Sequence, residues 1–286
     1  MSNIANHLRS PGDAKAIVIA LHCSGASRSE WRQLGTALGH RFRVIALDLI
    51  GSGGSPHWTA DRAFRLSDEA AEVVRIIDEA KRPVHLVGHS YGGCVALRAA
   101  FERPTQVASM ALYEPVSFPI LKSLGSEGKT AFEEFYAVAQ SIRQLVLYGV
   151  HEAAAKRFFE YWSGEGSWAA LRVEARNDLI RYIPKFFLEY SAVISERTPL
   201  YAYRRFNIPV LMLQGEHSPQ SMQLISGQLA KAMKFASLQT VYGAGHMGPF
   251  THAAIVNAMM TEWIVRAEPG IPSGEQAFDL PFDRVA

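Results

Sequence analysis

One stretch of ten residues constrains the fold more than any other part of the chain. An apolar run that begins at Val84 leads into Gly-His-Ser-Tyr-Gly at residues 88–92, and a helix-forming segment follows. This order predicts a strand, a sharp turn and a helix, with the Ser90 Oγ projecting above the edge of a sheet. Glycine suits positions 88 and 92 because a Cβ there would clash with the neighbouring strand and helix. The start of the helix would direct backbone N–H groups at an oxyanion formed beside Ser90.

Strand and helix patterns alternate on both sides of this stretch. Strands are predicted at residues 16–21, 43–49, 83–88, 107–113, 208–214 and 236–242. Most of these runs are continuously apolar and rich in β-branched residues, which is typical of strands buried on both faces. The chain is therefore predicted to adopt an α/β fold with a mostly parallel central sheet flanked by helices. Ligands of such sheets bind at the carboxyl ends of the strands, where Ser90 falls.

The alternation breaks between residues 117 and 204. Four helices are predicted there, at residues 129–147, 152–161, 168–182 and 185–194. The segment holds 16 of the chain's 30 Phe, Trp and Tyr residues, in under a third of its length. Apolar helices inserted into an α/β chain predict a cap over a pocket. We therefore expect a core at residues 1–116 and 205–286 and a helical cap at 117–204. Most of the cap's aromatic side chains are expected to pack its own helices and a minority to line the pocket.

Four motifs occur in the order that is found in the α/β-hydrolase superfamily. Residues 22–25 (His-Cys-Ser-Gly) resemble the oxyanion loop of that family, and residues 48–55 resemble its Asp-x-x-Gly-x-Gly-x-Ser loop. Residues 88–92 match the nucleophile elbow, and residues 243–247 resemble the loop that carries the catalytic histidine. The resemblance covers most of the chain and implies the α/β-hydrolase fold, in its capped, esterase- and lipase-like branch. Serine at position 90, where related dehalogenases and epoxide hydrolases have aspartate, argues against their chemistry.

The resemblance implies that Ser90 is the nucleophile and His246 its base. A serine hydroxyl is a poor nucleophile at neutral pH and needs a base within hydrogen-bond reach. His246 follows the last predicted strand in a glycine-flanked loop that can reach back over the sheet. The alternatives are a structural turn serine and a surface-loop histidine, and the ordered motifs argue against both.

The position of the acidic residue that would orient His246 departs from the commonest pattern of the family. That pattern has aspartate three residues after Gly215, where this chain has Ser218. Serine cannot carry the negative charge that stabilises an imidazolium. Glu114 ends the strand after the nucleophile helix, a position from which some related haloalkane dehalogenases take their acid. We predict Glu114 as the acid, with Glu216 as the alternative.

Two backbone N–H groups are expected to form the oxyanion hole. One belongs to Tyr91, directly after the nucleophile, and the other to Ser24, in the loop after the first strand. Cys23 stands where the family usually has glycine. Cysteine is small enough for such a loop, and nothing near it in the sequence would activate its thiol.

Composition limits the expected cofactors, partners and location. The net charge is +2 without a basic block, so neither nucleic acid nor a membrane is an expected partner. The histidines are not at metal-ligand spacing, and we expect neither a metal nor an organic cofactor. Two cysteines, Cys23 and Cys94, do not make a disulfide framework, and a cytoplasmic location is expected. The sequence predicts no particular oligomeric state.

These features together predict a serine hydrolase that cleaves a small ester or related carbonyl substrate through an acyl-enzyme. The aromatic-rich cap favours a small-molecule substrate with an apolar acyl or aromatic group. The same residue set also carries out thioester hydrolysis, carbon–carbon bond hydrolysis, acyl transfer and cofactor-free peroxidation. A weakly catalytic ligand-binding or signalling protein of the same fold is a further alternative, and Ser218 in place of the usual acid favours it.

Overall fold

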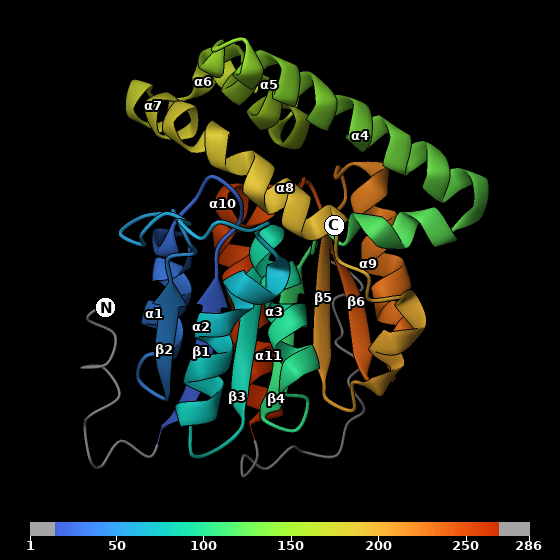
Figure 1. The fold of residues 1–286 in the computed structure, drawn as a ribbon. Coiled ribbons are helices and arrows are strands. Elements are labelled where there is room, and N and C mark those ends of the chain that lie inside the picture. The colour runs from blue at the N-terminus through green and yellow to red at the C-terminus, as the bar shows by residue number, and fades with distance from the viewer. Residues whose placement is uncertain (1–14, 269–286) are drawn as a thin grey trace.

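The computed structural model describes residues 15–268 and is built around one six-stranded sheet (Figure 1). The strands are β1 (Ala16–Leu21), β2 (Phe42–Leu47), β3 (Val84–His89), β4 (Val107–Tyr113), β5 (Val210–Gly215) and β6 (Ala236–Val241). Their order in the sheet is β2-β1-β3-β4-β5-β6, and every neighbouring pair is parallel. The prediction of a mostly parallel sheet is confirmed. Residues 1–14 and 269–286, which belong to the predicted core, lie outside the described residues.

Helices cover both faces of the sheet. One face packs against α1 (Arg32–Leu38) and α11 (Ala253–Ala267), and the other against α2 (Leu66–Glu79), α3 (Tyr91–Glu102) and α9 (Gln220–Ala232). In β1, Ile17, Ile19 and Leu21 join one hydrophobic cluster while the alternate residues join the other. Successive side chains of a strand point to opposite faces, so a continuously apolar strand feeds two cores at once.

Five helices are inserted between β4 and β5 and lie across the carboxyl ends of the strands (Figure 1). These cap helices are α4 (Gly125–Leu147), α5 (His151–Ser163), α6 (Ser167–Ala170), α7 (Val173–Tyr182) and α8 (Phe186–Ile194). Short 3₁₀ turns precede and follow them at Phe118–Ser123 and Leu200–Arg205. Their place matches the predicted cap, and the domain boundaries at residues 117 and 204 stay a prediction.

The prediction of one helix at residues 168–182 is wrong. The chain leaves the helical conformation between α6 and α7, where Leu171 and Arg172 are extended. The Arg176 guanidinium donates to the Ala169 carbonyl oxygen at 2.6 Å, and this bond replaces an intrahelical one. A tertiary hydrogen bond from a side chain seven residues away is not visible in helical periodicity.

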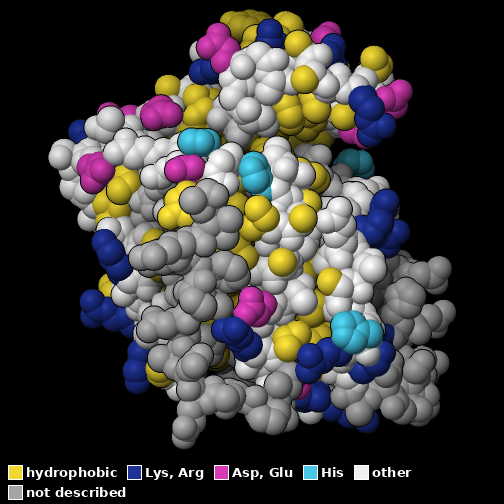
Figure 2. Space-filling model, turned by 180° about the vertical axis from the view of Figure 1, so that it is seen from behind, with side chains coloured by type: hydrophobic (Ala, Val, Ile, Leu, Met, Phe, Trp, Pro, Cys, Tyr) yellow, Lys and Arg dark blue, Asp and Glu magenta, His cyan; other side chains and the backbone are white. Residues whose placement is uncertain are grey.

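The surface carries basic and acidic side chains with apolar ones between them. Figure 2 shows both charge signs scattered over the back of the molecule, without one large patch of either sign. Among residues 15–268, no helix has the length and apolar character that crossing a bilayer requires.

Candidate active site

Ser90 lies at a strained turn between β3 and α3. Its backbone has φ 55° and ψ −116°. Within the described residues, Ser90 and Glu114 are the two non-glycine residues with positive φ. Such conformations cost about 1–3 kcal/mol and cluster at functional sites. Both strained residues follow the carboxyl ends of neighbouring strands, β3 and β4.

The turn requires glycine on each side of Ser90. A Cβ on Gly88 would lie 2.7 Å from the Gly92 carbonyl oxygen, and a Cβ on Gly92 would lie 2.3 Å from the Leu21 carbonyl oxygen. The second contact shows how closely the start of α3 packs against the end of β1. This packing brings the Tyr91 N–H, which has no acceptor within its helix, beside the loop that follows β1.

Gly92→Ala is therefore expected to destabilise the protein strongly. The added methyl group overlaps backbone atoms, which cannot move aside as a flexible side chain would, and a cost of about 3 kcal/mol is expected. Thermal unfolding followed by circular dichroism measures the effect. Gly227→Ala is the matched control, because a Cβ on Gly227 in α9 meets nothing within 4 Å. A wild-type Tm for Gly92→Ala would contradict this account of the turn.

Ser90, His246 and Glu114 form one chain of hydrogen bonds. The Ser90 Oγ lies 2.9 Å from His246 Nε2, and His246 Nδ1 lies 2.6 Å from Glu114 Oε2. All three are buried, with Ser90 4% and His246 2% exposed. A carboxylate only accepts, so Nδ1 carries the ring proton and the neutral ring presents the Nε2 lone pair to the Ser90 hydroxyl. This is the arrangement that a general base needs.

The sheet brings these three residues together. His89 and Tyr113 are register partners, so the residues that follow them, Ser90 and Glu114, emerge side by side. The Ser90 N–H donates to the Tyr113 carbonyl oxygen at 2.9 Å. The loop after β6 carries His246 back over the sheet, and the Tyr113 hydroxyl holds that loop by donating to the Gly245 carbonyl oxygen at 2.7 Å.

The two candidate acids have different surroundings. Glu114 is fully buried, and its second oxygen accepts from the Gly215 N–H at 2.7 Å. Glu216 is exposed, and its Oε2 accepts from the Gly243 N–H at 2.8 Å. Among the described residues, no hydrogen bond joins Glu216 to His246. The Ser218 hydroxyl, at the position of the expected aspartate, is buried and lacks a hydrogen-bond partner in the described chain.

Burial controls the protonation of the histidine. It lowers the pKa of His246 below the usual 6.5, while the hydrogen bond and charge of Glu114 oppose this shift. The net direction is downward, so the ring is neutral and able to accept a proton at neutral pH.

The loop after β1 has a path that the sequence could not predict. The Cys23 N–H donates to Glu30 Oε2 at 2.9 Å. The Cys23 carbonyl oxygen accepts from His22 Nδ1 at 2.7 Å and from the Ala26 N–H at 3.3 Å. In a trans peptide the N–H points opposite to the carbonyl, so the Ser24 N–H faces away from His22 and Ala26. It donates no hydrogen bond within the described residues. Burial raises the pKa of the Cys23 thiol well above its usual value, so the thiol stays protonated.

His89 and Glu30 form a second buried pair that sequence reasoning missed. His89 Nδ1 lies 2.7 Å from Glu30 Oε1, and His89 Nε2 donates to the His246 carbonyl oxygen at 2.9 Å. Cys23, Glu30 and His89 place atoms that can ligate metals within 4.8 Å of one another. Both Glu30 oxygens already accept hydrogen bonds there, so a metal would have to displace them. The sequence feature that could have indicated this pair is the position of His89 within the nucleophile-elbow motif.

The cap helices place an aromatic cluster above His246. Trp162, in α5, has its ring centroid 4.1 Å from that of His246. Phe118 and Phe135 stack with centroids 3.4 Å apart, and both lie within 6.4 Å of Trp162. Trp162 is thus a cap aromatic that reaches His246, and the expectation that a minority of them line a pocket stays a prediction.

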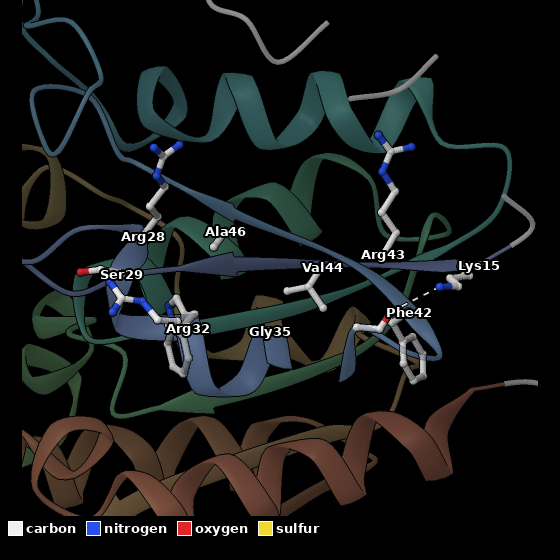
Figure 3. A pocket seen from close by; sticks show the side chains of 11 residues that line it. Lys15, Arg28, Ser29, Arg32, Gly35, Phe42, Arg43, Val44 and Ala46 are labelled. Carbon is white, nitrogen blue, oxygen red and sulfur yellow. Dashed lines mark hydrogen bonds between the residues drawn. The ribbon is translucent and has the colours of Figure 1, made fainter. Parts of the chain in front are cut away.

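A separate groove of about 530 Å³ runs along β2 at the edge of the sheet (Figure 3). Its basic side chains are Lys15, Arg28, Arg32 and Arg43. Neither Ser90 nor His246 lines this groove, which is therefore distinct from the buried hydrogen-bond chain.

Comparisons with known proteins identify the family and the fold. A family model described as "Alpha/beta hydrolase family" matches residues 18–259. The chain is 27% identical over 274 residues to a protein assigned as the carbamate hydrolase RutD of Variovorax paradoxus, covering 92% of this chain and 97% of that one. Among solved structures, MenH from S. aureus has a TM-score of 0.70 at 18% identity, covering 88% of this chain and 94% of its own. The carboxylesterase CesB from Bacillus subtilis has a TM-score of 0.64 at 17% identity, covering 89% and 85%. Both structures share the fold.

Proposed function

The chain belongs to the alpha/beta hydrolase family and is an enzyme of the hydrolase class, and we propose that it cleaves a small ester or related carbonyl substrate through an acyl-enzyme on Ser90. The observation that carries this proposal is the hydrogen-bond chain from the Ser90 hydroxyl through His246 to the buried Glu114. A serine, a base and an orienting acid in this order are the elements of nucleophilic acyl transfer.

In the proposed reaction, the Ser90 Oγ attacks the carbonyl carbon of the substrate while His246 Nε2 takes the hydroxyl proton. The carbonyl oxygen becomes an oxyanion, which accepts hydrogen bonds from the Tyr91 and Ser24 N–H groups. The intermediate collapses, the bond to the leaving group breaks, and His246 gives its proton to the departing oxygen. Water then attacks the acyl-enzyme by the same steps and releases the acid. Glu114 stabilises the imidazolium ion that forms twice per turnover.

The substrate class follows from what surrounds Ser90. Trp162 lies over His246 and joins a cluster of phenylalanines, so we propose an apolar or aromatic acyl group. The similarity to RutD makes a carbamate a second candidate, because its carbonyl carbon undergoes the same attack.

A panel of p-nitrophenyl esters with acyl chains of increasing length, together with an aryl carbamate, tests this function. A burst of p-nitrophenol equal to the enzyme concentration, followed by slower turnover, is the expected result. A preference for carbamate over every ester would favour the second candidate. No burst and no turnover on any member would favour a ligand-binding protein that retains the fold.

The pH dependence of kcat/KM provides another expected outcome. The neutral His246 ring is the base, so activity is present above its pKa and is lost as the pH falls through it. Because burial lowers the pKa of His246, the midpoint of the acid limb should lie below 6.5. A pH–rate profile on one p-nitrophenyl ester measures this midpoint. A midpoint above about 7 would contradict the neutral, buried base.

A further inference from the structure

A buried polar cluster joins the cap helices to the loop that follows β1, and the mechanism above does not use it. Its centre is Glu189 in α8, which is 2% exposed. Glu189 Oε2 accepts from the Ser24 hydroxyl at 2.5 Å and from the Tyr182 hydroxyl at 2.6 Å. The other oxygen lies 2.7 Å from Lys185 Nζ, one helical turn earlier. A cap carboxylate therefore contacts the residue whose N–H is the proposed oxyanion donor.

Lys185 also bonds to the core of the protein, beside a second buried carboxylate whose pKa its charge affects. Its Nζ donates to the Ser52 hydroxyl at 2.8 Å, in the loop after β2. Close by, Glu69 Oε2 accepts from the Tyr91 hydroxyl at 3.0 Å. Burial raises the pKa of Glu69 to about 7, against the opposing charge of Lys185. The side chains of both proposed oxyanion donors, Ser24 and Tyr91, thus donate to buried carboxylates, Glu189 and Glu69.

The contribution of such a cluster to the stability of the fold does not by itself account for its presence. Moving a charged group from water into the protein interior costs roughly several kcal/mol for each ion. Apolar residues of similar volume often stabilise a buried site equally well. Buried hydrogen bonds to a charged group do, however, hold their partners in one arrangement. The partner fixed here is the Ser24 hydroxyl, whose oxygen is three covalent bonds from the backbone nitrogen of the same residue.

We propose that Glu189 is a positioning residue of the oxyanion hole, which holds Ser24 from the cap so that its N–H faces the reacting carbonyl. The inference rests on the proposed serine mechanism and deepens it. Because Glu189 belongs to α8, the hole is complete only while that helix is seated on the core.

Two variants remove the bond from opposite ends. Ser24→Ala deletes the hydroxyl but keeps the backbone N–H and every buried charge. Glu189→Leu deletes the acceptor at similar size. Each is expected to lower kcat about 10- to 100-fold, because the donor is misplaced rather than lost, while KM changes less than about twofold. The double variant should lose no more than the more impaired of the two single variants, since both changes break the same Ser24–Glu189 bond.

Two further variants separate positioning from simple cap stability. Glu189→Gln keeps an acceptor oxygen for Ser24 and should retain kcat within about threefold. Glu127→Gln alters a different link between cap and core, the exposed 2.9 Å bond from Gln220 Nε2 in α9 to Glu127 Oε1 in α4, and should leave kcat unchanged. Thermal unfolding of each variant shows whether it is folded. If Glu189→Leu does not fold, the kcat of Ser24→Ala alone tests the proposal.

The rate at which a fluorophosphonate labels Ser90 distinguishes the possible failures. If the wild type is labelled and turns over esters, but Ser24→Ala and Glu189→Leu keep its kcat, the positioning role is overturned and the proposed function stands. Additive losses in the double variant also overturn the role. If the wild type is neither labelled nor active, the proposed function is overturned, and this inference with it.

Discussion

Ser90→Ala is expected to lower kcat by about 10⁵-fold or more, the largest effect of any single substitution in this chain. The variant has no nucleophile, so no acyl-enzyme forms, and His246 retains a neutral Nε2 without a hydroxyl to activate. The residual rate reflects the oxyanion N–H groups and substrate binding alone. Ser90 is 4% exposed, and its hydroxyl contacts His246. The substitution removes only one oxygen atom from this buried position, so the fold should persist.

Steady-state hydrolysis of a p-nitrophenyl ester, with active-site titration of the wild type, measures this loss. Ser226→Ala is a matched control, because Ser226 is a fully buried serine whose hydroxyl has no hydrogen-bond partner in the described chain. That control should keep kcat and KM. A Ser90→Ala variant within tenfold of the wild type would show that another group attacks the substrate.

Glu114→Gln is expected to have the second largest effect, lowering kcat by about 10³- to 10⁴-fold. A glutamine can turn its NH₂ group toward His246 Nδ1, which then becomes the acceptor and leaves the ring proton on Nε2. The ring would face Ser90 with a proton instead of a lone pair. The variant also lacks the negative charge that stabilises the imidazolium ion. KM should change little, because Glu114 is fully buried beneath the histidine.

Glu216→Gln is the control for this prediction. Glu216 is exposed and its oxygen accepts from the Gly243 N–H, so the variant should keep kcat within about twofold. Parallel kcat measurements on the two variants decide between the candidate acids. A large loss in Glu216→Gln with little loss in Glu114→Gln would reverse the assignment.

The parts of the fold that could be predicted are those set by local sequence. Continuously apolar strands such as Ala16–Leu21 fix the parallel sheet, and the glycines at 88 and 92 fix the turn between β3 and α3. Helix α3 begins at Tyr91 and ends at Glu102, as its flanking glycine turn and Pro104 indicate. The break between α6 and α7 differs from the prediction because the Arg176 side chain, seven residues on, satisfies the Ala169 carbonyl.

The candidate site was predictable in its residue types and less so in its contacts. The order of motifs indicated Ser90 and His246, but the sequence offered two acids, because both Glu114 and Glu216 follow strand ends. Register between β3 and β4 is what places Glu114 beside Ser90, and register is a property of the folded sheet. Its role as the acid stays a prediction.

The buried pairs around the site were beyond sequence reasoning. Glu30 meets His89 across 59 positions, and Glu189 meets Ser24 across 165. Periodicity places residues on a helix or strand face and gives no information about which distant side chain they meet. Such contacts follow only from the way that segments far apart in the chain pack together in the folded protein.

Trapping the acyl-enzyme is the measurement that tests the central claim most directly. The wild-type protein is mixed with p-nitrophenyl butyrate, quenched in acid during the burst, digested and examined by peptide mass spectrometry. The account predicts a butyryl group on Ser90, absent from Ser90→Ala and longer-lived in variants that impair deacylation. Rapid turnover without a butyryl group on any peptide, or with the group on another residue, would contradict it.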